Sequence, residues 1–287
     1  SIFEAFMSII EKINKRRYIK VDFFMMYNLL FFILILISNY SFSQILPSYH
    51  AVHHKPGIIN DNLILHLDAS NPNSLDPNDL SEWNDLSSSN NDLSLFSGTM
   101  QFSSDAGGSL VFDNDIYKRD SDLNNMSYTN ITISMWVKTT VSACYLSSLS
   151  RSLGSNGHHY EFVFIIRGNG TFRFWDFKTG SSSPKYGFAQ EANNVSNSII
   201  NNGNWKLITF TKDNLTGKYY VNSSLDQTVT AYTNVNYGYD NFLIGKNWRD
   251  NNLPFNGSIG AVYLYTKTLS QDEITQNYNA TKSRYGH

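Results

Sequence analysis

The sequence predicts an all-β fold in which two antiparallel sheets pack face to face, with one short C-terminal helix and an N-terminal hydrophobic targeting helix. From residue 62 onward, short apolar runs recur between clusters of Gly, Asn, Ser and Asp, which is the pattern of sandwich strands and their turns. Aromatic residues make up 15% of the 287 residues and charged residues 16%, so the chain can fill a sizeable core. Strands with one apolar face must bury it against a second layer, which favours a sandwich.

The first 43 residues have the order of a secretory signal. Basic residues precede nine apolar ones, Leu29–Ile37, and the small residues Ser41 and Ser43 follow, so we expect cleavage after Ser43. The alternative is a retained membrane anchor, because the roughly twenty residues of Phe23–Phe42 would just span a bilayer. We therefore expect a secreted or extracellular protein, or a membrane-anchored one with its domain outside. Membrane contact is expected only if this segment is retained.

The rest of the chain is expected to hold a linker, residues 44–61, and one β-rich domain, residues 62–287. Ile131–Val137 shows the strand pattern most clearly, because its odd-numbered residues are all apolar and share one face. The residues Gly168–Gly170 supply the positive φ that a tight hairpin needs. We expect further strands at His159–Arg167, Thr171–Phe177, Trp205–Thr211, Lys218–Asn222, Phe242–Gly245 and Ile259–Tyr265.

A capping box predicts the C-terminal helix. Ser270 is followed three residues later by Glu273, and the next residues extend a helix from Ser270 to Ala280. We expect Trp136 and Trp205 to belong to the core between the sheets. Trp83 is expected to pack rather than to contact a ligand.

Four stretches in order carry a family likeness. They are Leu63–Ala69 with Trp83–Ser87, Gly108–Asp113, Ile133–Lys138, and Phe255–Ile259 with Val262–Tyr265 and Leu269–Ile274. Over nearly all of Asn62–Gly286 the chain resembles the laminin G-like, concanavalin A-like lectin and glucanase domains. The resemblance implies a jelly-roll sandwich of the concanavalin A-like type. This family commonly has an Asp-Glu pair where this chain has Gly260 and Ala261, so a role for such a pair is not carried over.

Charge and cysteine content exclude several classes of function. The chain has 22 Lys and Arg against 24 Asp and Glu, and the first 43 residues hold five of the basic ones, so the remainder is acidic. A nucleic-acid partner is not expected, because such proteins need a basic surface. Cys144 is the single cysteine, which excludes an intrachain disulfide and a cysteine-based zinc site.

The leading interpretation is a secreted, non-catalytic carbohydrate-binding or adhesion module. The resemblance implies its partner, a glycan or another ligand on the cell surface or in the extracellular matrix. One alternative is a structural or decorating surface protein of a cell or virus. Another is a divergent glycoside hydrolase, which would need two carboxylates beside the scissile bond. Glu161 and Asp176 are the best pair, but no Glu-x-Asp-x-Glu motif is present, so we expect no enzyme and no catalytic residue.

Aromatic faces flanked by polar side chains bind sugars, usually on loops at a rim. Three segments combine such groups, residues 151–159, 178–188 and 237–249. The candidate ligand-binding residues are Trp248, Arg249, Tyr186, Tyr239 and Trp175.

Calcium is the one cofactor that the sequence allows for. Relatives often carry it at the rim, and it takes six to eight oxygen ligands. Asp113 and Asp115 offer two carboxylates two residues apart. Because Gly260 and Ala261 replace the acidic pair, we expect weak calcium dependence or none, and no other cofactor.

Overall fold

The computed structural model describes residues 8, 57–119, 121, 123–124, 129–152, 158–178, 185–186, 193–231, 241–246 and 253–287. For residues 150–152, 158–161, 177–178 and 185–186 it describes the backbone alone. The chain forms two compact units, Ser1–Lys55 and Pro56–His287. In the first unit only Ser8 is described, and it is helical. Every helix in the described part of the chain is too short or too polar to cross a lipid bilayer.

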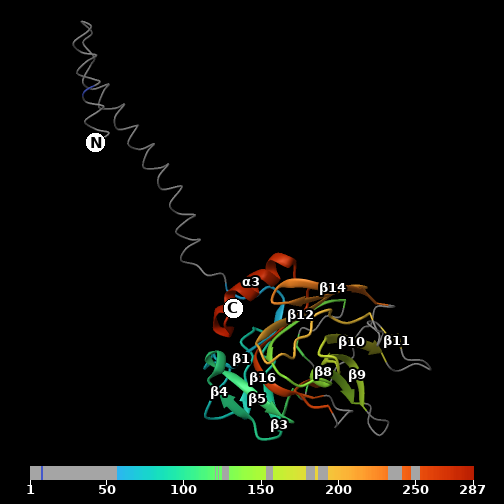
Figure 1. The fold of residues 1–287 in the computed structure, drawn as a ribbon. Coiled ribbons are helices and arrows are strands. Elements are labelled where there is room, and N and C mark those ends of the chain that lie inside the picture. Colours follow the sequence, from blue (N-terminus) through green and yellow to red (C-terminus); the bar gives the residue numbers. More distant parts are fainter. Residues whose placement is uncertain are drawn as a thin grey trace. The chain divides into compact units, whose positions relative to one another are not determined.

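The second unit is a sandwich of two antiparallel sheets (Figure 1), and its described residues give each sheet eight strands. In the first sheet the strand order is β14-β13-β12-β7-β16-β5-β4, with β1 also paired to β16. Strand β16 is central, since it runs beside β7 while its two halves pair with β5 and β1. The strands of the first sheet are β1 Leu63–Asp68, β4 Gln101–Ser103, β5 Ser109–Asp113, β7 Asn130–Lys138, β12 Lys206–Asp213, β13 Thr216–Val221, β14 Ser224–Thr230 and β16 Asn256–Tyr265.

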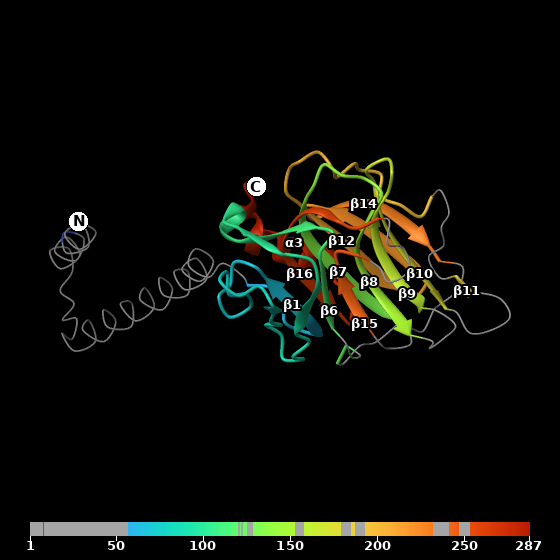
Figure 2. The ribbon, with the colours of Figure 1, turned by 90° about the horizontal axis from the view of Figure 1, so that it is seen from below.

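The second sheet has the order β11-β10-β9-β8-β15-β6-β3-β2. Its strands lie beside those of the first sheet as a second layer (Figure 2). The all-β, two-sheet fold class is confirmed. The strands of the second sheet are β2 Glu82–Trp83, β3 Leu93–Ser97, β6 Ile116–Arg119, β8 Cys144–Ser152, β9 His158–Ile166, β10 Phe172–Lys178, β11 Lys185–Tyr186 and β15 Asn241–Ile244.

The main core fills the space between the sheets. The predicted apolar face of β7 lies there, with Ile131, Ile133 and Met135 fully buried. Across the gap, Phe174 of β10 stacks on Phe210 of β12 with ring centroids 4.3 Å apart. Burying such a side chain contributes about 1.5–3 kcal/mol. The aromatic residues that alternate along these strands therefore hold the two layers together.

A buried ion pair crosses the same core. Lys212 of β12 donates from Nζ to Oδ2 of Asp176 on β10 at 3.0 Å, and both side chains are fully buried. Two charges removed from water must be matched in this way, because a lone buried charge costs several kcal/mol. The pair joins the strand that carries Trp175 to the opposite sheet.

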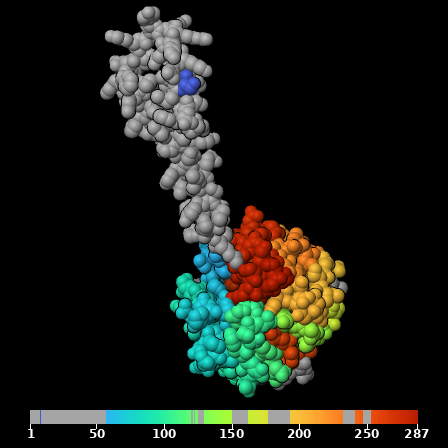
Figure 3. All heavy atoms as spheres, turned by 60° about the vertical axis from the view of Figure 1, so that its left-hand side comes forward, coloured from blue at the N-terminus to red at the C-terminus, as the bar shows by residue number. Residues whose placement is uncertain are grey.

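The C-terminal helix α3, Gln271–Thr281, covers the outer face of the first sheet. Its predicted capping box is confirmed: Ser270 Oγ accepts from the Glu273 amide at 3.3 Å, and Glu273 Oε2 accepts from the Ser270 amide at 2.8 Å. A short 3-10 helix, η3 Lys282–Tyr285, follows it. In Figure 3 this red C-terminal segment lies against the blue segment that begins at residue 57, and Gln276 donates to the Gly57 carbonyl there.

Two tryptophans lie under this helix rather than between the sheets, which corrects the sequence prediction. Trp136 is fully buried, stacks on Tyr285 with centroids 3.9 Å apart, and donates from Nε1 to Thr281 Oγ1 at 3.0 Å. Trp205 is also buried and lies 5.0 Å from Tyr285. The reason is strand alternation, because an even-numbered residue of β7 points away from the face that holds Ile133. Trp83 packs on Tyr117 in the main core, as predicted.

Candidate functional site

The outer face of the second sheet carries a compact group of aromatic, aliphatic and cationic side chains. Strand alternation places them, because Phe172 and Phe174 of β10 point into the core and therefore turn Arg173 and Trp175 outward. The same alternation turns Ile165 of β9 outward, and Tyr145 of β8 lies on the same face.

The strand register brings these side chains side by side. Tyr145 pairs with Ile165, and Ile165 pairs with Arg173, so the three form one row across β8, β9 and β10. Trp175 pairs with Val163 in the next row. Cross-strand neighbours on one face have Cβ atoms about 5 Å apart, which lets their side chains form a continuous surface. Tyr145, Val163, Ile165 and Trp175 make up this apolar surface.

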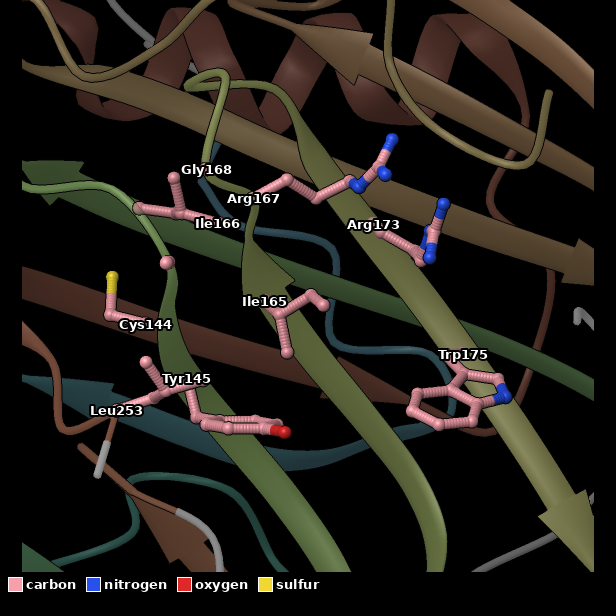
Figure 4. A pocket seen from close by; sticks show the side chains of 10 residues that line it. Cys144, Tyr145, Ile165, Ile166, Arg167, Gly168, Arg173, Trp175 and Leu253 are labelled. Atoms are coloured by element: carbon pink, nitrogen blue, oxygen red, sulfur yellow. The ribbon is translucent and has the colours of Figure 1, made fainter. Parts of the chain in front are cut away.

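A hollow of about 210 Å³ lies on this face (Figure 4). Tyr145 and Trp175 lie on either side of Ile165, while Leu253 lies beside Tyr145. The Tyr145 amide donates to the Leu253 carbonyl at 3.0 Å, so the segment before β16 is fixed against β8. The hollow therefore has walls on a sheet and on a segment bonded to that sheet.

Two arginines form the cationic end of the hollow. The guanidinium groups of Arg167 and Arg173 lie at the same end in Figure 4. Arg173 is buried and donates from Nε to the Asn194 carbonyl at 2.9 Å. Burial lowers the pKa of Arg173, and the neighbouring Arg167 charge lowers that pKa further, while Tyr219 opposes the change. This end of the hollow is therefore positive.

Cys144 adjoins the hollow, but its side chain packs in the main core between the sheets. The residue is buried, and burial raises the pKa of its thiol to about 12, opposed by a hydrogen bond with the Ile166 backbone. Because the thiolate is the nucleophilic form, the thiol is unreactive near neutral pH.

The structure describes two of the five predicted ligand-binding residues, Trp175 in full and Tyr186 in its backbone alone. Trp175 lines the hollow. Tyr186 lies in β11, where its backbone pairs with Phe177, two residues beyond Trp175. Trp248, Arg249 and Tyr239 lie outside the described residues.

The predicted calcium ligands lie in the turn between β5 and β6. The Asp115 side chain is buried, and its Oδ2 accepts from the Asp113 amide at 2.7 Å. Asp113 Oδ1 accepts from Asn256 Nδ2 at 2.9 Å. These carboxylates close the turn and bind it to β16. Among the described residues, no three His, Cys, Asp or Glu side chains gather as metal ligands.

Of the two carboxylates weighed for glycoside hydrolysis, Asp176 lies inside the sandwich. Asp176 is paired in register with Phe162, and its buried carboxylate binds Lys212 inside the sandwich. The side chain of Glu161, on the neighbouring strand β9, lies outside the described residues.

Sequence reasoning missed Tyr145, Arg167, Arg173 and Leu253. The signal for Arg173 was present, because a strand reading Phe-Arg-Phe-Trp with buried phenylalanines must expose Arg and Trp on one face. Arg167 ends a predicted strand, so its position beside Arg173 follows from the hairpin at residues 168–170. Leu253 reaches the hollow through a tertiary contact that no local pattern reveals.

A family model for the concanavalin A-like lectin/glucanases superfamily, of the laminin G type, matches residues 112–275, more than half of the chain. The chain belongs to this superfamily. Among curated proteins, none matches the chain.

Solved structures share the superfamily fold. Domain 4 of AbnA, a GH43 extracellular arabinanase from Geobacillus stearothermophilus in complex with arabinotriose, is 21% identical with a TM-score of 0.54, over 77% of this chain and 100% of that one. The botulinum neurotoxin serotype D binding domain is 20% identical with a TM-score of 0.51, over 77% of this chain and 52% of that one. The chain therefore spans about half the length of that toxin binding domain. At these identities the likeness establishes the fold.

Proposed function

We propose that this chain is a non-catalytic carbohydrate-binding module and that the hollow on the second sheet is its sugar-binding site. The observation that carries the proposal is the placement of Trp175 and Tyr145 on either side of Ile165 on an outer face. A sugar ring has an apolar face that stacks on such side chains, and the polar atoms at the rim select its hydroxyl groups.

The size of the site also favours a small ligand. Pockets for drug-sized ligands occupy about 300–1,000 Å³. The hollow of about 210 Å³ is smaller, so it suits one sugar ring of a longer glycan. Affinity per site is then expected in the range of roughly micromolar to millimolar.

The structural neighbours support a glycan as the ligand class. One of them is described in complex with arabinotriose, and others are described as toxin binding domains. We propose export as well, since residues 1–43 have the order of a signal sequence. A secreted module would meet glycans on surfaces or in a matrix.

A glycan array followed by titration tests the proposal. We expect the wild type to bind a defined set of glycans, and Trp175→Ala to weaken that binding five- to tenfold, because one stacking contact contributes about 1 kcal/mol. Trp248→Ala tests the predicted loop contact in the same assay, with an expected loss of similar size.

The matched control is Phe96→Ala. It removes an aromatic ring that is 48% exposed on β3 of the same sheet, away from the hollow, so binding should be unchanged. A wild type that binds no glycan, or a Trp175→Ala variant that binds as the wild type does, contradicts the proposed site.

A further inference from the structure

We infer that the hollow binds the carboxylate of an acidic sugar, a uronic or sialic acid unit, and that the Arg167 guanidinium is the group that receives it. This inference rests on the proposed carbohydrate-binding function and adds the ligand's charge. Three observations carry it: an arginine without a carboxylate among the described residues, a second arginine beside it, and an apolar surface next to both.

Four other cations in the described part of the chain pair with a carboxylate. Arg284 Nη1 donates to both carboxylate oxygens of Asp68, at 2.7 and 2.9 Å. Lys138 meets Asp105 at 2.7 Å. Lys212 meets Asp176 in the core, and Lys267 meets Asp61 and Glu273.

Arg167 differs from these cations. Its side chain is half-buried, yet it makes no ion pair or side-chain hydrogen bond with any residue that the structure describes. Its backbone is fixed, since the Arg167 amide donates to the Thr171 carbonyl at 2.7 Å and the Arg167 carbonyl accepts from the Gly170 amide at 2.9 Å. The hairpin therefore fixes the backbone of Arg167 at the hollow, and no described residue occupies the donors of its guanidinium.

Arg173 increases the positive potential at this point. It is held from behind by the Asn194 carbonyl and lies at the same end of the hollow as Arg167. No described residue that lines the hollow is acidic. An anion beside Arg167 would relieve the repulsion between the two guanidinium groups, which a neutral ligand could not do.

The geometry of the group favours a carboxylate as the anion. A guanidinium presents parallel N–H donors that match the two oxygens of a planar carboxylate. Tyr145, Ile165 and Trp175 then provide the apolar surface for the ring that bears it. An acidic sugar has both features on one small unit, in keeping with the volume of the hollow.

Isothermal titration of the full chain with matched probes tests the inference. The pairs are trigalacturonic acid with galactotriose, and 3′-sialyllactose with lactose, and sulfated lactose is the third arm. We expect at least one carboxylate probe to bind about tenfold more tightly than its neutral counterpart, the typical effect of a charge-assisted pair. This preference should weaken as salt concentration rises.

Two variants at Arg167 separate charge from geometry. Arg167→Gln should lower the affinity for the acidic probe about tenfold, to that of the neutral counterpart. Arg167→Lys should retain part of the preference, because it keeps the positive charge but lacks the parallel N–H donors of a guanidinium. Lys218→Gln is the control, since it removes one positive charge from β13 of the other sheet and should change nothing.

These measurements distinguish failure of the acidic-sugar inference from failure of the carbohydrate-binding proposal. Equal binding of acidic and neutral probes, with both weakened in Trp175→Ala, overturns the inference and leaves the carbohydrate-binding proposal standing. Tighter binding of the sulfated probe than of either carboxylate overturns the choice of carboxylate. An acid preference that persists in Arg167→Gln overturns the role of Arg167. Binding of no probe and no array glycan overturns the proposed function itself.

Discussion

The two outer faces of this sandwich both carry tryptophan and tyrosine, yet they differ in what lies over them. On the first sheet, α3 and η3 cover Trp136, which stacks on Tyr285. On the second sheet, Tyr145 and Trp175 line a hollow, and no helix lies over them in the described part of the chain. Aromatic residues on a strand therefore do not identify a binding face. What distinguishes the two faces is whether a helix covers them, because aromatic residues packed under a helix form a second core.

Replacing one tryptophan on each face by alanine should give the largest difference in stability between the two faces. Trp136→Ala should reduce the free energy of unfolding by about 4 kcal/mol, because a fully buried ring leaves a cavity. Trp175→Ala, at a partly exposed position, should cost about 1 kcal/mol or less. Urea unfolding of both variants measures the difference, and equal losses would show that the two faces are packed alike.

The next largest loss of stability is expected from the buried ion pair in the core between the two sheets. Lys212→Met removes the cation from the buried Asp176 carboxylate and should cost about 3 kcal/mol in urea unfolding. Adding Asp176→Leu should recover most of that loss, since an apolar pair can replace a buried ion pair at little cost. A double variant that is less stable than Lys212→Met alone would mean that the charges themselves stabilise this fold.

The smallest expected effect is on the pH dependence of stability, through the partly buried His66 near the covered face. His66 of β1 lies 5.0 Å from Tyr263, and burial lowers its pKa, against the opposing charges of Asp68 and Asp85. The unfolded chain then binds a proton at a higher pH than the folded one does, so stability falls as the pH drops below about 6.5.

We expect the melting temperature to fall between pH 7.5 and pH 5 by on the order of 2 °C more in the wild type than in His66→Gln. Scanning calorimetry at several pH values measures this. An identical pH dependence in the two proteins would contradict burial of His66 in the folded state.

Much of the fold could be predicted from the sequence because strand alternation is local. The odd-numbered residues of β7 and the capping box at Ser270 both lie where their patterns indicate. The covered face could not be predicted, since alternation turns Trp136 away from the main core without showing that α3 receives it. The candidate site could be predicted in part. Trp175 follows from the pattern of its strand, whereas Arg167 comes to the hollow through the hairpin and Leu253 through a tertiary contact.

We propose that the outer face of the second sheet, and not the aromatic face under α3, binds the glycan. Titrating ¹⁵N-labelled protein with trigalacturonic acid or 3′-sialyllactose, while recording amide chemical shifts, tests it most directly. The account predicts saturable shifts at Tyr145, Ile165, Arg167 and Trp175, with the amides of α3 unmoved. Shifts confined to α3 and the strands beneath it, or no shifts with any glycan that the array identifies, would contradict it.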